Sequence, residues 1–273
     1  MNIQDLFNLD KKIAFISGGA TGIGRMAAEA MAMAGARVLI ASRKGSLCAS
    51  VAEELNQKGY KGIVESFEGD LSSEAGVEAV VKEIKIRTGQ LNILMNNAGR
   101  SWGAPLGSFP HSAWEKVMSL NVAGLFSLTQ SLIPLLEKSA THEDPARVIN
   151  VGSVMGEIPM GDGAYSYSAS KAAVHQITKV LAKELASKKI TVNALAPGPF
   201  VSNMTAFATA DPEKRQKVGQ NVPLGRVGSQ NDIAGAVIFL TSNAGSYVTG
   251  SILPLSGGIN IETGSRIFEE DKR

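Results

Sequence analysis

The chain has 273 residues, of which 44% are apolar and 19% are charged, and its formal net charge is +2. This balance is typical of a globular protein with enough apolar residues for a core, and it excludes an intrinsically disordered chain. So small a net charge gives no reason to expect nucleic acid or an anionic membrane as a partner. The single cysteine, Cys48, cannot form an internal disulfide, and the sequence shows neither a basic leader nor an apolar run of about 18 residues. We therefore expect a cytoplasmic protein.

Short apolar runs alternate with longer helical patterns along the chain. The runs predict strands at residues 12–17, 37–41, 62–68, 93–96, 147–151, 190–195 and 251–255. The helical patterns lie at residues 22–34, 46–58, 73–88, 112–139, 164–187 and 231–241. Continuous apolar strands that alternate with helices predict an α/β fold, a doubly wound Rossmann-type domain whose parallel sheet of about seven strands is covered by helices on both faces.

No linker divides this series, so residues 1–273 are expected to form one dinucleotide-binding and catalytic domain. Residues 140–146 form a short polar excursion. Residues 200–222 form a longer one, and its length favours a functional cover over a simple turn. From residue 204 onward this segment predicts a flexible apolar cover for a substrate chain. The charged tail, residues 262–273, is expected to be loose.

A glycine-rich segment separates the first predicted strand from the first helix, and it reads Ser17-Gly18-Gly19-Ala20-Thr21-Gly22-Ile23-Gly24. Glycines there permit a tight turn and a close approach of the backbone, and the free N–H groups at the start of a helix attract a pyrophosphate. The segment thus predicts a dinucleotide site, although a structural turn is the alternative. Its candidate cofactor-binding residues are Gly18, Thr21, Gly22, Ile23 and Gly24.

The spacing Gly18-x-x-x-Gly22-x-Gly24 resembles that of the short-chain dehydrogenase/reductase family. Further motifs of the family follow in the same order, at Asn96-Asn97-Ala98-Gly99, Asn121, Ser153, Tyr167-Ser168-Ala169-Ser170-Lys171 and Pro197-Gly198. Within the family, residues 101–104, 114–118 and 145–150 are similar to bacterial 3-oxoacyl-acyl-carrier-protein reductases, above all the rhamnolipid-associated type. The resemblance implies an NADP(H)-dependent oxidoreductase that reduces a 3-oxoacyl thioester, carried by acyl carrier protein or CoA, to its 3-hydroxyacyl form.

The end of the second strand is where a dinucleotide fold distinguishes its cofactors. The sequence there is Ala41-Ser42-Arg43-Lys44, without a carboxylate, and the planar cation of Arg43 suits a 2′-phosphate. We therefore expect NADP(H), the alternative being that Arg43 is an ordinary solvated charge. Thr21 stands where many NADP-using members of the family carry a second basic residue.

The resemblance implies further cofactor contacts, from Asp70, Leu71, Asn97, Ala98, Gly99, Tyr167, Lys171, Pro197, Gly198, Phe200 and Ser202. In the family the position of Asp70 meets the adenine, and the segment from Pro197 to Ser202 holds the nicotinamide carboxamide, with the backbone amide of Phe200 taking part. Two plainer readings stay open: Asp70 or Ser72 could cap the following helix, and Gly99 could merely permit a turn.

Reduction of a ketone needs a proton donor and a polarising hydrogen bond at the carbonyl oxygen. Tyr167 and Lys171 are four residues apart on a predicted helix and share a face, so we expect the Lys171 cation to lower the pKa of the Tyr167 donor. The resemblance implies that Ser153 polarises the carbonyl and that Asn121 keeps a water chain in contact with Lys171. Tyr165 lies on another face and is assigned to the substrate-site wall or to packing.

The histidines His111, His142 and His175 show no ligand spacing, so no metal site is expected. His175 continues the Lys171 face and is assigned to helix packing. Lys188 and Lys189 close the helix that begins near Tyr167, and we expect them near the site entrance as docking groups for an acidic acyl carrier protein. The alternative is that they only complement the helix dipole.

The family habit of pairing the helices at residues 121–139 and 164–187 implies a homotetramer. Apolar residues lie on more than one face of these helices, namely Leu125, Phe126, Leu128, Val174, Ile177 and Leu181. Two other functions remain as alternatives: a dehydrogenase of a sugar, polyol or other alcohol, and a non-catalytic dinucleotide sensor.

Overall fold

A computed structural model of the chain describes residues 2–160, 163–202 and 204–261. Its centre is a seven-stranded parallel sheet with the order β3-β2-β1-β4-β5-β6-β7. The strands are β1 (Ile13–Ser17), β2 (Arg37–Ser42), β3 (Ile63–Glu68), β4 (Ile93–Asn96), β5 (Ala146–Val151), β6 (Ile190–Pro197) and β7 (Ile252–Leu255). The predicted doubly wound fold is therefore confirmed, because the order reverses between β1 and β4.

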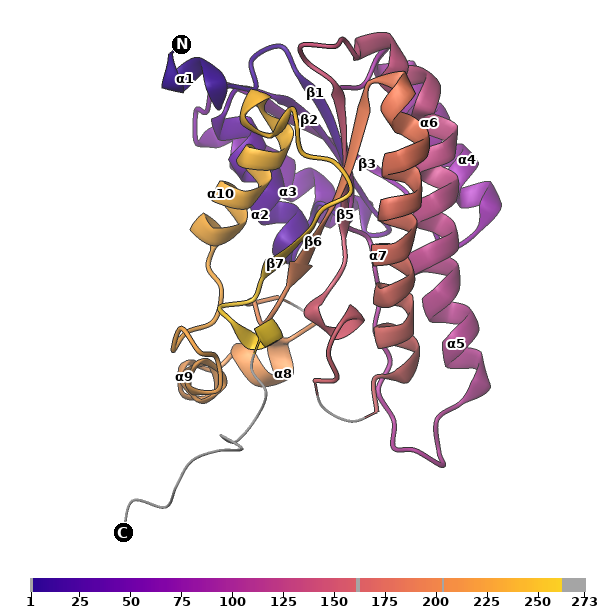
Figure 1. The fold of residues 1–273 in the computed structure, drawn as a ribbon, viewed down its shortest axis with the longest axis vertical. Coiled ribbons are helices and arrows are strands. Elements are labelled where there is room, and N and C mark those ends of the chain that lie inside the picture. The colour runs from indigo at the N-terminus through magenta and orange to yellow at the C-terminus, as the bar shows by residue number, and fades with distance from the viewer. Residues whose placement is uncertain (1, 161–162, 203, 262–273) are drawn as a thin grey trace.

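Helices cover both faces of the sheet, as Figure 1 shows. One face carries α2 (Gly22–Met33), α3 (Gly45–Gln57) and α10 (Gln230–Thr241), and the other carries α4 (Glu74–Arg87), α6 (Leu125–Ser139) and α7 (Tyr165–Leu185). Successive strand residues point to opposite sides, so Ile16 joins the first core and Phe15 the second. The apolar strands are buried on both faces for this reason.

The helical pattern at residues 112–139 is not one regular helix. It comprises α5 (His111–Met118), a π-helical segment Ser119–Gly124, and α6. A side chain at Gly124 would lie 2.3 Å from the Leu71 carbonyl oxygen, so the chain passes here in close contact with the segment that follows β3. Such π-helical insertions are frequent at functional sites.

The run His111–Ser139 is long and apolar enough to cross a membrane, which the sequence reading overlooked. Half of its most apolar stretch of 18 residues is buried within the fold, however. Leu128, Leu132 and Leu136 belong to the core between the sheet and the helices. The core helix of a folded domain meets the same criteria of length and composition, and this run is one.

The excursion at residues 200–222 contains two helices that the sequence reading did not assign, α8 (Ala206–Thr209) and α9 (Pro212–Gln220). Asp211 caps α9 by accepting hydrogen bonds from the amides of Glu213 and Lys214, and Pro212 follows the cap. Because α9 is rich in charged residues, the predicted apolar character holds for the part around Phe207 but not for α9. A short α1 (Ile3–Leu6) was also not predicted. The tail at residues 262–273 lies outside the described residues.

A buried chain of amides and hydroxyls ties the sheet to two helices. Asn96 at the end of β4 donates to Thr129 Oγ1 of α6 and to Asn150 Oδ1 of β5, both at 2.8 Å. Asn150 in turn donates to Thr178 Oγ1 of α7 at 2.9 Å. Leaving buried polar groups unpaired is energetically costly. This hydrogen-bond network therefore fixes α6 and α7 at the end of the sheet where the pocket lies.

We expect Asn150→Ala to lower the free energy of unfolding by about 2 kcal/mol, since it removes two buried hydrogen bonds and leaves their partners unpaired. Urea unfolding followed by circular dichroism measures the change. Gln57→Ala, on an exposed turn of α3, is the control and should shift the value by less than about 0.5 kcal/mol. Equal midpoints for Asn150→Ala and the parent would contradict the assigned role of the network.

Candidate functional site

A pocket of about 520 Å³ lies at the carboxyl ends of the central strands, where the strand order reverses. It brings together residues that the sequence reading singled out along most of the chain. These pocket-lining residues are Gly18, Thr21, Gly22, Ile23, Arg43, Asp70, Leu71, Asn97, Ala98, Gly99, Ser153, Tyr167, Lys171, Pro197, Gly198, Phe200 and Ser202. Two candidates, Gly24 and Asn121, lie behind the wall of the pocket and do not line it.

The glycine loop runs along this pocket in a conformation that side chains would obstruct. Gly18 and Gly22 have φ values of 67° and 53°, in the left-handed region that favours glycine. A Cβ atom at Gly24 would lie 2.4 Å from Asn97 Nδ2. Gly24 is therefore needed for close packing against Asn97, whereas Gly18 and Gly22 shape the surface that faces the pocket.

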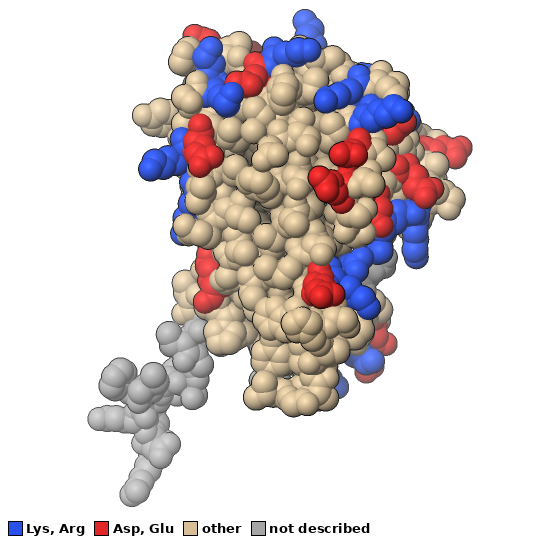
Figure 2. Space-filling view, turned by 90° about the vertical axis from the view of Figure 1, so that its right-hand side faces the viewer, with Lys and Arg blue, Asp and Glu red and all other residues tan. Residues whose placement is uncertain are grey.

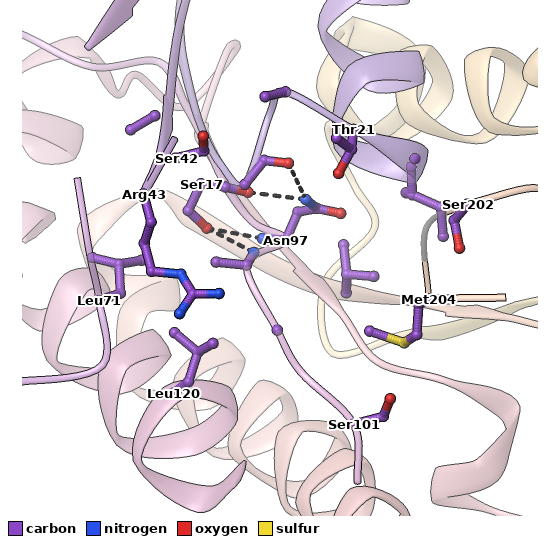
Figure 3. A pocket seen from close by; sticks show the side chains of 18 of the residues that line it. Ser17, Thr21, Ser42, Arg43, Leu71, Asn97, Ser101, Leu120, Ser202 and Met204 are labelled. Carbon is purple, nitrogen blue, oxygen red and sulfur yellow. Dashed lines mark hydrogen bonds between the residues drawn. The ribbon is translucent and has the colours of Figure 1, made fainter. Parts of the chain in front are cut away.

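Ser17 and Asn97 clamp the glycine loop to the end of β4 (Figure 3). Asn97 Nδ2 donates to the carbonyl oxygens of Ser17 and Gly18, both at 3.0 Å. Ser17 Oγ accepts from the backbone amides of Asn97 and Ala98 at 3.1 and 3.0 Å. Asn97 thus holds the loop that would carry a pyrophosphate.

At one end of the pocket the side chain of Arg43 extends toward Leu71 and Leu120 (Figure 3). Lys44 lines the same end, and within the described part of the chain the guanidinium of Arg43 makes no hydrogen bond or ion pair. Asp70 is the one carboxylate among the described lining residues. This end of the pocket is therefore positively charged and suited to a phosphate.

Asp70 does not cap the helix that follows it. Its Oδ1 accepts from the Ser72 amide at 3.0 Å, within the turn after β3. The cap of α4 is Ser73, whose hydroxyl accepts from the Gly76 amide. The alternative of a helix cap at Asp70 or Ser72 is therefore wrong, and Asp70 lies on the pocket wall instead.

At the other side of the glycine loop, the segment after β6 forms a compact hydroxyl turn. Ser202 Oγ lies 3.0 Å from Thr205 Oγ1, and that hydroxyl also bonds the Phe200 carbonyl at 2.5 Å. A Cβ atom at Gly22 would lie 3.0 Å from that of Ser202. The turn at Ser202 therefore faces the start of α2 across a narrow gap. The Phe200 ring is buried against Gly228.

Ser153, Tyr167 and Lys171 meet at the third side of the pocket, near the end of β5. Ser153 begins the turn after that strand, and its hydroxyl accepts from the Met155 amide at 3.2 Å. Lys171 Nζ is buried, donates to the Val151 carbonyl at 2.7 Å and lies 5.5 Å from the centroid of the Tyr167 ring. A hydroxyl, a phenol and an ammonium thus converge where the strand ends.

Burial dominates the acid–base properties of this group. It lowers the pKa of Lys171 from 10.5 to about 8, and it raises the pKa of Tyr167, an effect that a hydrogen bond with the Ser153 hydroxyl partly offsets. The expected lowering of the Tyr167 pKa by Lys171 is therefore not the net result in this geometry, because the effect of burial on the phenol is larger. The ammonium bonds the strand-end carbonyl and lies over the ring, so its charge does not offset the desolvation of the phenol.

Asn121 lies behind the wall of the pocket, in the π-helical segment Ser119–Gly124. Its Oδ1 accepts from the Arg100 amide at 2.9 Å, and its Nδ2 donates to the Arg100 carbonyl and to Ser170 Oγ, both at 2.9 Å. Asn121 therefore joins the segment after β4 to α7. Gly99 lies between the Asn121 amide and the Lys171 ammonium.

Lys188 and Lys189 do not lie near the site entrance of their own chain. They follow the C-terminal end of α7 and precede β6, so they lie at the amino ends of the strands, opposite the pocket (Figure 1). Because α7 has 21 residues at about 1.5 Å each, roughly 30 Å separates them from Tyr167. Lys188 also pairs with Glu137 at 2.5 Å. The expected position of these docking lysines is wrong within one subunit.

Several residues that line the pocket are not predicted by the sequence analysis. Ser17 and Thr205 shape the loop and the hydroxyl turn, while Ser101, Leu120 and Met204 line the pocket itself. Ser17 carried a signal, since a hydroxyl at the last position of the strand before the glycine loop is placed to bond neighbouring amides. Tyr165 contacts the Phe109 ring at 5.3 Å, as the packing assignment allowed. Groups of metal-binding side chains are absent among the described residues.

Comparisons with known proteins match almost the whole chain. A sequence profile of the family described as enoyl-(acyl carrier protein) reductase matches residues 18–260. A rhamnolipids biosynthesis 3-oxoacyl-[acyl-carrier-protein] reductase of Pseudomonas aeruginosa is 46% identical over 255 residues, which are 93% of this chain and 98% of that protein.

Solved structures are also similar. The Pseudomonas aeruginosa RhlG/NADP active-site complex has a TM-score of 0.90 and 45% identity, and the match covers 95% of this chain and 100% of that one. A gluconate 5-dehydrogenase from Burkholderia cenocepacia, in complex with NADP and tartrate, has a TM-score of 0.85 and 31% identity over 96% of this chain and 100% of its own. With the profile match and a relative 46% identical, these findings show that the chain belongs to the short-chain dehydrogenase/reductase family.

Proposed function

We propose that this protein is an NADPH-dependent reductase that converts a 3-oxoacyl thioester into the 3-hydroxyacyl form. The observation that carries the proposal is the convergence of Ser153, Tyr167 and Lys171 on a pocket whose opposite wall is the glycine loop. The relative named for 3-oxoacyl-carrier-protein reduction and the relative complexed with NADP support both the reaction and the cofactor. We further propose that it acts in the cytoplasm as a single domain with residues 200–222 as its cover.

The pocket fits a dinucleotide with an additional phosphate. The bare backbone of Gly18 and Gly22 leaves room for a pyrophosphate at the start of α2. Arg43 and Lys44 would hold the 2′-phosphate, Lys44 supplying the second cation that Thr21 does not provide. Asp70, Leu71 and the segment from Asn97 to Gly99 would surround the adenine and its ribose. The turn at Ser202 would hold the carboxamide.

Bound NADPH supplies the hydride that adds to the carbonyl carbon. The Ser153 hydroxyl donates a hydrogen bond to the carbonyl oxygen and polarises it, and Tyr167 Oη delivers the proton that this oxygen takes up. Tyr167 has an ordinary pKa of 10.0 that burial raises further, so near neutral pH the phenol is protonated and holds the proton to be donated. Lys171 is held by the Val151 carbonyl, and its ammonium form predominates below about pH 8, where it can stabilise the phenolate that remains.

The rim of the pocket favours an acyl chain over a sugar. Trp102, Leu106, Met204 and Phe207 expose 43%, 79%, 41% and 82% of their surface near segments that line the site. A sugar or polyol would require polar side chains in such positions, since its hydroxyls must be hydrogen-bonded when they leave water. The half-buried proton donor Tyr167 and the buried Lys171 have no use in a non-catalytic sensor. Both alternatives are therefore less well supported.

We propose that the protein assembles as a homotetramer through α6 and α7. The exposed positions of α6 up to Pro134 include Phe126 and carry no charge, nor does the exposed Ala123 just before this helix. On α7 the exposed positions Ala172 and Gln176 are likewise uncharged, and Val180 follows one turn further along, next to the exposed Lys179. Figure 2 looks onto this side of the molecule, where an uncharged surface runs down the middle of the view. Helices repeated about a two-fold axis could bury this surface.

Such pairing gives Lys188 and Lys189 a role that one subunit alone does not allow. A two-fold axis across α7 makes the paired helices antiparallel, so the lysine end of one subunit lies beside the Tyr167 end of its partner. We propose that an acidic acyl carrier protein docks there, on the partner's lysines, while its acyl chain enters the pocket. Carrier docking then depends on assembly.

We expect Tyr167→Phe to lower kcat for a 3-oxoacyl thioester by about 100-fold or more, because it removes the proton and keeps the ring. The dissociation constant for NADPH should stay within about threefold. Steady-state kinetics and fluorescence titration measure the two quantities.

Tyr165→Phe is the matched control and should keep activity. The substrate panel should include a small ketone, a sugar ketone and a 2-enoyl thioester. Reduction of the enoyl or sugar compound alone would show that the protein has the function of another branch of the family. Near-normal activity of Tyr167→Phe would show that Tyr167 is not the proton donor.

Arg43→Ala should weaken NADPH binding by about tenfold or more and leave NADH binding nearly unchanged, since only NADPH carries the 2′-phosphate. Isothermal titration with both nucleotides gives the two constants. Arg25→Ala removes an exposed arginine that pairs with Glu54 on the outer face, and it should change neither constant. Equal losses for the two nucleotides would mean that Arg43 is an ordinary surface charge.

Val180→Glu should split the assembly, because it places charges on the uncharged surface where the subunits pair. Analytical ultracentrifugation at micromolar concentration should give a tetramer for the parent and smaller species for the variant. Ile86→Glu alters an exposed apolar residue of α4 and should leave the tetramer intact. A monomeric parent protein would disprove the proposed assembly.

A further inference from the structure

His175 is a buried histidine directly behind the turn that carries Ser153. It lies on α7 one turn after Lys171, and only 6% of its surface is exposed. A Cβ atom at Gly152 would lie 2.2 Å from its Nε2, and one at Gly156 would lie 3.0 Å from its Cε1. The imidazole therefore occupies space that two glycines leave open, one on each side of Ser153.

The charged groups around this imidazole are few. Glu157, on the same turn, has Oε1 at 3.5 Å from Nδ1, while Lys171 and Lys179 flank the histidine on α7. Both ring nitrogens are buried without a hydrogen-bond partner among the described residues. Burial is the main cause that lowers the pKa of His175, and Lys171 and Lys179 act in the same direction while Glu157 opposes them. The neutral ring is therefore the form that fits.

We propose that His175 is a positioning residue: the neutral imidazole fills the slot between Gly152 and Gly156 and so holds the Ser153 hydroxyl toward Tyr167, and protonation of the ring displaces this turn. The proposal rests on the proposed function, in which Ser153 polarises the substrate carbonyl. It assigns to His175 more than the helix packing that its spacing on α7 suggests.

The displacement follows from where the opposite charge lies. A protonated ring in this slot needs an anion, and Glu157 is the nearest carboxylate, 39% exposed at the end of the same turn. Drawing Glu157 onto the ring moves residues 153–157, because the turn is short and Gly156 already lies against the backbone of α7, with its would-be Cβ 2.8 Å from the Lys171 carbonyl carbon. Acid pH should therefore lower kcat through Ser153 and leave nucleotide binding intact.

A substitution that keeps volume but cannot take up a proton tests this coupling. We expect the kcat of the parent enzyme for a 3-oxoacyl thioester to decrease as the pH is lowered below 6.5, the ordinary pKa of histidine, with little change in the KM for NADPH. His175→Leu should lack this acid limb, and its plateau should lie within about fivefold of the parent value. An acid limb of unchanged midpoint in His175→Leu would overturn the proposal. His142→Gln removes an exposed histidine and should leave the profile as it is.

A larger residue at Gly152 combined with a smaller one at His175 tests the contact between the two. Gly152→Ala should lower kcat by about tenfold or more, because its methyl group meets the imidazole, and the double variant Gly152→Ala/His175→Ala should recover at least about half of that loss on a logarithmic scale. The recovery is expected to be incomplete, since the same methyl group would lie 3.1 Å from the Leu195 carbonyl oxygen. A double variant as impaired as Gly152→Ala would show that ring and turn are not in functional contact.

A readout without turnover separates this proposal from the proposed function. In an NMR titration of the parent protein, the ring of His175 and the backbone amides of Ser153 and Met155 should shift with one common midpoint, and His175→Leu should abolish the shifts of the amides. Co-titration in a protein that reduces no ketone would retain the coupling and refute the reductase. An active reductase whose Ser153 amide does not follow His175 would refute the coupling alone.

Discussion

The amide of Asn97 is the contact on which the rest of the site depends. It joins the loop after β1 to the end of β4, so that the two halves of the sheet present one continuous surface where the strand order reverses. Asn97 Nδ2 also occupies the place of a Gly24 side chain, which explains why the third residue of α2 is glycine. The same amide therefore determines both the shape of the nucleotide cradle and the angle at which α2 leaves it.

The charge distribution of the pocket is unusual for a largely buried site. Among the described residues, the Lys171 ammonium donates its hydrogen bond to the Val151 carbonyl and not to a carboxylate, and Arg43 and Lys44 lie at the opposite end of the pocket. Three cations against the single lining carboxylate of Asp70 make the described pocket a site for an anion. Burial of an ammonium is costly, which is why the pKa of Lys171 falls to about 8.

The alternation of strands and helices was enough to predict the sheet, because strands buried on both faces leave continuous apolar runs. The motifs predicted which side chains line the pocket, since the carboxyl ends of parallel strands meet at one edge. Contacts between distant segments were beyond the sequence: the π-helical turn at Asn121 depends on the backbone of Arg100, and the pKa of Tyr167 depends on burial. The distance of Lys188 from Tyr167 followed from helix length alone, and the sequence reading did not use it.

The pairing of β1 with β4 also has a consequence for how the protein acquires its binding capacity. The contact between Ser17 and Asn97 spans 80 positions of the chain, so the nucleotide cradle cannot exist until the first three strands have docked on the later four. Parallel sheets with such distant contacts fold slowly, and their incomplete forms expose apolar surface. A ligand that binds only the finished cradle shifts this equilibrium by mass action. The concentration of the dinucleotide thereby becomes a determinant of how much of the chain is folded.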